Sequence, residues 1–141
     1  MGNAKARTHR TSYRRQQVTL YVCRSCVWSE AQREINGKRQ GEFLFEAIKR
    51  EIDLANVPKN IALRAVHCLN GCRSPCNVAF RSPGKHGLRF SRLTPNNADD
   101  VMSLLSIYSD SQVGDVQEQE MPENMRGKLT VRTPPSPLRS R

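Results

Sequence analysis

The stretch VTLYVCRSC, residues 18–26, begins with a short run of apolar and β-branched residues and ends in a pair of cysteines. A run of this length and composition favours a β-strand. We therefore expect a strand over residues 18–22 that brings Cys23 and Cys26 to its carboxyl end.

A second stretch, IALRAVHCLNGCRSPC at residues 61–76, has the same layout. Its first seven residues predict another strand, and Cys68, Cys72 and Cys76 follow it. Between the two strands, apolar residues recur at helical spacing over residues 41–56. A helix that joins two successive strands in this way predicts that they are parallel neighbours, with a right-handed crossover.

The next elements complete a domain of the α/β class. Residues 77–81 and 88–93 predict two short strands, joined by a turn rich in Pro and Gly. Thr94 and Pro95 predict the cap and the first residue of a second amphipathic helix. The expected order of elements is therefore β-α-β-β-β-α, in a single domain over residues 18–110.

The formal net charge of +10 belongs to the two ends of the chain. Residues 1–17 carry five bases and no acid, and residues 122–141 carry five bases and one acid. We expect a basic N-terminal tail over 1–17 and a polar, then Pro-rich and basic tail over 111–141, both disordered or extended. Residues 18–121 hold 13 bases and 12 acids and few aromatics, which disfavours a specific nucleic-acid partner.

The cysteines point to a reducing compartment. No run approaches the roughly 18 apolar residues that span a bilayer, and the basic N-terminus lacks the apolar stretch of a secretory signal. We therefore expect a cytoplasmic protein without a membrane span. Clustered cysteines in that setting usually bind metal or do redox chemistry, and five is an odd number for a disulfide framework.

The predicted topology also says where the cysteines meet. Because the carboxyl ends of parallel strands lie at one edge of a sheet, Cys23 and Cys26 should converge with Cys68 and Cys72. Four thiolates can hold a [2Fe–2S] cluster or a zinc ion, and we assign these four as ligands. Cys76 is either a spare buried thiol or a replacement for Cys26 or Cys72.

Three other interpretations stay open. C-x2-C motifs commonly bind zinc, although the C-x3-C-x3-C spacing of the second motif is unusual for a zinc site. Cys23 and Cys26 alone could form the dithiol of an oxidoreductase, in which such a motif starts a helix. The third interpretation is that the cysteines are buried for packing alone and neither bind metal nor do redox chemistry. No P-loop or dinucleotide fingerprint is present, so we expect a carrier or metal-binding protein rather than an enzyme.

The order of elements and the loop CLNGC at residues 68–72 resemble the thioredoxin-like [2Fe–2S] ferredoxins, which include the small subunit of NADH dehydrogenase. Those proteins space their first two cysteines more widely. The motifs CRSC at 23–26 and CLNGCRSPC at 68–76, followed by TPP at 133–135, resemble more closely a family of small bacterial proteins of unsettled function, described as predicted metal-binding.

This resemblance implies a thioredoxin-like fold and a [2Fe–2S] cluster. It also implies electron transfer as the function, with an unidentified redox or metal-handling protein as partner. A homodimer stays open.

Overall fold

The computed structural model describes residues 17–55, 60–68 and 75–136. In chain order its elements, with η for a short 3-10 helix, are β1 (Val18–Cys23), α2 (Gln40–Ala55), β2 (Ile61–Val66), β3 (Val78–Arg81), β4 (Gly87–Phe90), η1 (Pro95–Asn97), α3 (Ala98–Asp110), η2 (Glu118–Glu120), η3 (Glu123–Met125) and β5 (Leu129–Thr133). Up to α3 this is the predicted order, so the α/β class is confirmed.

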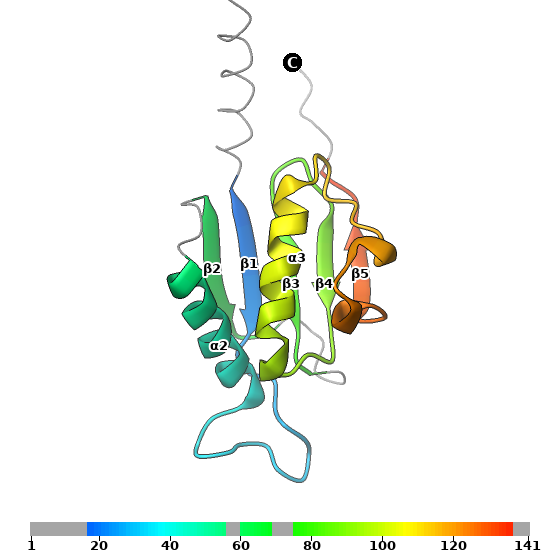
Figure 1. Cartoon of the computed structure of the whole chain (residues 1–141). Coiled ribbons are helices and arrows are strands. Elements are labelled where there is room, and N and C mark those ends of the chain that lie inside the picture. The colour runs from blue at the N-terminus through cyan, green and yellow to red at the C-terminus, as the bar shows by residue number, and fades with distance from the viewer. Residues whose placement is uncertain (1–16, 56–59, 69–74, 137–141) are drawn as a thin grey trace, which may run out of the picture.

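The five strands form one sheet in the order β2-β1-β3-β4-β5 (Figure 1). β1 and β2 are parallel, as the helical crossover predicts, and Cys23 at the end of β1 pairs with Val66 at the end of β2. β3 pairs with the other side of β1 in the antiparallel sense, so Val78 at its start lies beside Val22. Three segments therefore meet at one edge of the sheet: the ends of β1 and β2 and the beginning of β3.

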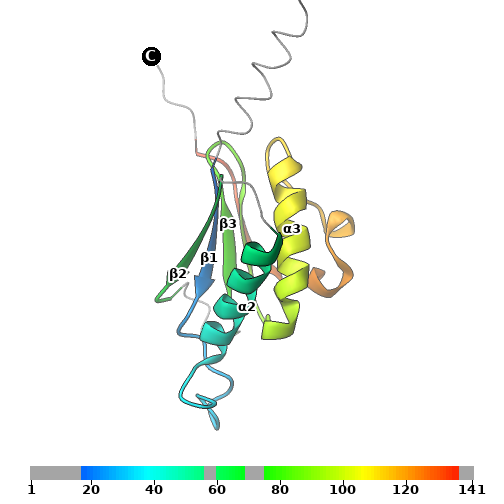
Figure 2. The same ribbon diagram turned by 60° about the vertical axis from the view of Figure 1, so that its left-hand side comes forward.

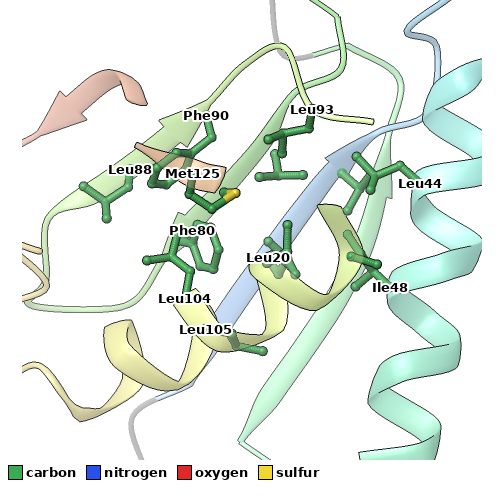
Figure 3. Packing of buried hydrophobic residues seen from close by; sticks show 14 of the residues in the cluster. Leu20, Leu44, Ile48, Phe80, Leu88, Phe90, Leu93, Leu104, Leu105 and Met125 are labelled. Carbon is green, nitrogen blue, oxygen red and sulfur yellow. The ribbon is translucent and has the colours of Figure 1, made fainter. Parts of the chain in front are cut away.

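Both long helices cover the same face of this sheet (Figure 2). Alternation along β1 turns Leu20 and Val22 toward the helices, where both side chains are fully buried. Leu44 and Ile48 of α2 and Leu104 of α3 belong to the same buried cluster (Figure 3). Burial of one such side chain contributes about 1.5–3 kcal/mol, so this layer fixes the helices on the sheet.

The folded domain extends beyond residue 110, where the sequence predicted a tail. β5 adds a fifth strand by pairing with β4, and Val116, Met121 and Met125 are buried in the core. These apolar residues stand singly in a polar segment, so they give no helical or strand period to recognise. The C-terminal segment as far as residue 136 is thus part of the domain.

The rest of the two predicted tails, residues 1–16 and 137–141, lies outside the described residues. Among the helices that the structure describes, none is long and apolar enough to cross a membrane.

Candidate metal centre

The loop that follows β1 is tied to the end of β2. The Ser25 hydroxyl donates a hydrogen bond to the backbone carbonyl of His67, and the Cys23 Sγ lies 3.7 Å from the same oxygen. Cys68 is the next residue in the chain. The two cysteine motifs therefore begin side by side, as expected from parallel strands.

The described cysteines divide into three buried thiols and one exposed thiol. Cys23 and Cys26 are 1% and 3% exposed, and Cys76 is completely buried. Cys68 is exposed. Cys72 lies outside the described residues, so its role as a ligand stays a prediction.

Cys76 reaches this edge because β3 runs antiparallel to β1. Its backbone N–H and C=O both bond to Leu93, at 3.1 Å each, which holds the residue in the sheet just before β3 begins. Its side chain hydrogen-bonds with Cys26, and Cys26 also hydrogen-bonds with Cys23. Cys76, which the sequence predicts to be a spare thiol or a substitute ligand, is thus a direct neighbour of Cys26.

Cys26 also accepts a hydrogen bond from a buried amide. The Asn77 Nδ2 lies 3.5 Å from the Cys26 Sγ, and Asn77 is fully buried. The hydroxyl of Ser91, also buried, donates to the Asn77 Oδ1 at 2.6 Å. This bond uses the oxygen of the amide, so its N–H remains directed at the sulfur.

Several opposing effects act on the Cys26 thiol, and together they raise its pKa. The largest single effect, the hydrogen bond with Cys23, lowers the pKa. The hydrogen bond with Cys76, burial and the charge of Cys76 raise it and outweigh the lowering by Cys23 and by the Asn77 amide. Metal binding at Cys26 would therefore have to displace a proton from a thiol that holds it firmly.

The helix α2 begins against the first cysteine motif. The backbone N–H of Gly41 donates to the Cys26 carbonyl at 3.0 Å. A Cβ at position 41 would lie 2.1 Å from the Cys23 carbonyl oxygen, so only glycine fits there. This close approach puts the positive end of the helix dipole beside the loop, and that position favours negative charge such as a thiolate.

A loop over residues 27–39 separates the first cysteine motif from α2. The turn predicted at Asn36 and Gly37 is present, with positive φ at both residues. The Trp28 ring packs against Phe43 of α2 with ring centroids 5.5 Å apart, which anchors the loop on the helix. The motif therefore does not run directly into a helix, as the C-x-x-C of a thioredoxin-like oxidoreductase does.

Within residues 17–55, 60–68 and 75–136, no group of three or more His, Cys, Asp or Glu side chains is arranged so that it could hold a metal ion. The donor types at this edge nevertheless fit a metal that prefers sulfur. They are thiols, two of them within one C-x2-C motif, next to an amide N–H and a helix N-terminus. Iron–sulfur clusters and structural zinc both take such thiolates.

Sequence reasoning missed Gly41, Asn77 and Ser91. A glycine at the start of a helix is a weak signal, and its close approach to Cys23 becomes visible only in three dimensions. Asn77 follows a cysteine directly, but nothing in the sequence pairs it with Ser91. That pair depends on the register of the sheet, which single-sequence patterns do not predict.

Among solved structures, the chain is similar to a thioredoxin-like [2Fe–2S] ferredoxin from Aquifex aeolicus, with 15% identity and a TM-score of 0.48, over 86% of this chain and 98% of that chain. A structure of the wild-type thioredoxin-like [2Fe–2S] ferredoxin from the same organism is 15% identical, with a TM-score of 0.43, over 61% of this chain and 82% of that chain. A cysteine-to-serine variant of that ferredoxin is 16% identical, with a TM-score of 0.43, over 60% of this chain and 82% of that chain. None of the curated proteins matches the chain.

A protein-family model matches residues 20–135, which is most of the chain and includes both cysteine motifs and β5. Its description is "Protein of unknown function (DUF1636)". The match agrees with the resemblance to a family of unsettled function that the cysteine motifs indicate. The chain belongs to the DUF1636 family.

Proposed function

We propose that the protein binds a metal centre through the thiolates of Cys23, Cys26, Cys68 and Cys72. We further propose that this centre is a [2Fe–2S] cluster and that the protein carries single electrons. The observation that carries the proposal is the surroundings of Cys26, a buried thiol that faces an oriented amide N–H at the edge where both cysteine motifs begin.

The amide supports a charged sulfur at this position. A thiol is a weak hydrogen-bond acceptor, whereas a thiolate is a strong one. A buried thiolate without a cation would be costly, and a bound metal removes that cost. The Asn77 N–H directed at Cys26 is therefore best explained by a sulfur that bears negative charge in the working protein, bound to metal.

A bound [2Fe–2S] cluster would supply one-electron redox chemistry. The residues of the chain have separate tasks in this proposal. Buried Cys23 and Cys26 would shield a bound cluster from water, while exposed Cys68 would give a partner protein access to it. The N–H of Asn77 favours the more negative, reduced state and so raises the reduction potential.

Zinc is the second candidate, because the C-x2-C motif at Cys23 and Cys26 is typical of zinc sites. The same four thiolates would bind the zinc ion, and the protein would then handle metal or use the zinc to stabilise its structure. Zinc thiolates do not absorb visible light, so colour separates the two candidates. The dithiol oxidoreductase needs only Cys23 and Cys26, so that function would survive loss of Cys68.

The proposal is tested by single cysteine-to-alanine variants purified without oxygen, with metal per chain measured in each. Loss of metal in Cys68→Ala and in Cys72→Ala, with most of it kept in Cys76→Ala, supports the assigned ligands. If Cys76→Ala loses the metal and Cys72→Ala keeps it, the fourth ligand is Cys76 and not Cys72. The Cys76 thiol already lies beside Cys26. Wild-type metal content in the Cys68 variant would refute a site that includes both motifs.

A further inference from the structure

The face of the sheet that the helices leave uncovered carries only positive charge on its strands. The five strands together contain four arginines and no Asp or Glu. Arg64 of β2 pairs with Tyr21 of β1, and Tyr21 pairs with Ala79 of β3, which pairs with Arg89 of β4. These four residues form one row across the face turned away from the helices.

A second row adds another arginine to this face. Thr19 of β1 pairs with Arg81 of β3, whose side chain is exposed. The fourth strand arginine, Arg132, pairs with buried Leu88 and therefore lies on the helix side, where Asp115 holds it at 2.6 Å. Arg64 and Arg81 form no ion pair with any residue that the structure describes.

This outer face is hollowed. A cavity of about 950 Å³ opens on it, and Tyr21, Arg81, Arg89, Val131 and Pro134 are among its lining residues. None of the lining residues is acidic. The lining thus includes the Tyr21 ring, aliphatic groups and two guanidinium groups, together with neutral polar residues such as Thr19 and Thr133.

The ends of the described chain lie at the rim of the same cavity. Gln17 and Ser136 both line it. The sequences beyond them, residues 1–16 and 137–141, contain seven Lys and Arg residues and no acid. The strands of the outer face thus carry three arginines and no acid, and the terminal sequences that adjoin Gln17 and Ser136 in the chain are also basic.

We propose that this outer face binds single-stranded nucleic acid without sequence preference. Arginines contact phosphates, and a half-exposed tyrosine on an open sheet offers a surface on which a base can stack. Positive charge that continues beyond both rims fits a polymer of phosphates better than one small anion. The proposal is independent of the metal centre, which lies at the other end of β1.

The test uses the full chain and a fluorescent oligothymidylate of about 20 nucleotides, with affinity measured by anisotropy over a series of salt concentrations. Each lost phosphate contact on a single strand reduces the slope of log K against log salt by about 0.7, so Arg81→Gln with Arg89→Gln should reduce it by about 1.4. Tyr21→Leu should weaken binding about 5-fold or more through lost stacking, with little change in slope.

Arg50→Gln is the matched control, because Arg50 is an exposed arginine on α2, on the opposite side of the sheet. It should bind about as tightly as the wild type. Equal losses in the control and the outer-face variants would overturn the proposal, as would outer-face variants that bind like the wild type. If poly-glutamate displaces the fluorescent oligonucleotide as strongly as unlabelled oligonucleotide does, the proposed nucleic-acid ligand is wrong and an acidic protein is the partner. Circular dichroism verifies that every variant is folded.

Discussion

Replacement of Gly41 by alanine should displace the first cysteine motif from α2. The new Cβ would lie 2.1 Å from the Cys23 carbonyl oxygen and 2.9 Å from two backbone atoms of Arg24. Real Cβ atoms essentially never approach another atom closer than 3.0 Å, so the loop must move by about 0.9 Å. Both obstacles are backbone, which cannot rotate out of the way as a flexible side chain could.

Two effects of opposite sign set the magnitude. Alanine in a helix is more favourable than glycine by about 1 kcal/mol. Overpacking against a fixed backbone costs about 1–3 kcal/mol, and an overlap of this size belongs at the upper end. The variant should therefore lose about 1–2 kcal/mol of unfolding free energy, and it should hold less metal because Cys23 and Cys26 are displaced.

The measurement is denaturant unfolding followed by circular dichroism, with metal content determined on the same sample. Gly87→Ala is the control, because its Cβ would make only ordinary contacts, the nearest to the Thr133 Cβ at 3.7 Å. That control should stay within about 0.5 kcal/mol of the wild type. A Gly41→Ala protein as stable as the wild type, with full metal content, would refute the close packing of α2 on the cysteine loop.

Three further predictions concern the site, the core and the domain boundary. Asn77→Leu should cost about 1 kcal/mol of stability by removing the buried hydrogen bond with Ser91, whose hydroxyl keeps Thr130 as its other partner, and it should lower the reduction potential of a bound cluster, measured by redox titration. Burial raises the pKa of Tyr108 to about 12, despite an opposing effect of Arg81. Because the unfolded tyrosine ionises near pH 10, stability should fall between pH 10 and 12 by up to about 2.7 kcal/mol, whereas Tyr108→Phe should lack this loss in alkaline unfolding. Truncation after residue 110 should abolish cooperative unfolding by removing β5 and three buried side chains, whereas truncation after residue 136 should not.

Each of these has an outcome that would contradict it. An unchanged potential in Asn77→Leu would mean that the amide does not act on a bound cluster. Equal alkaline destabilisation in wild type and Tyr108→Phe would show that the tyrosine has an ordinary pKa. A truncated chain ending at residue 110 that unfolds cooperatively at the wild-type midpoint would restore the shorter domain expected from the sequence.

The central part of the fold could be predicted because its signals are local and periodic. The apolar run at residues 18–22, the helical spacing after residue 41 and the second strand from residue 61 together imply a parallel pair. That pair alone places the starts of both cysteine motifs at one edge. The cap at Thr94 could also be predicted, and its side chain accepts a hydrogen bond from the Asn96 backbone. It caps the short helix η1, however, and α3 follows directly with Asn97 at its own N-cap position.

Features that depend on register or on isolated anchors could not be predicted. β5 and the buried residues Val116 and Met121 lie in a polar segment without a period. The proximity of Cys76 to Cys26 follows from the antiparallel direction of β3, which the sequence does not state. The row of arginines on the outer face likewise needs the pairing of four strands, so overall charge gave no indication of it.

The central claim is that the cysteine edge holds a metal through thiolates, as a [2Fe–2S] cluster. Its most direct test is the visible spectrum of the full chain purified without oxygen, with iron, acid-labile sulfide and zinc quantified on the same sample. We predict a red-brown protein with iron and sulfide in equal amounts. A colourless protein with stoichiometric zinc would contradict the cluster, and a protein without either metal after anaerobic cluster reconstitution would contradict the metal centre itself.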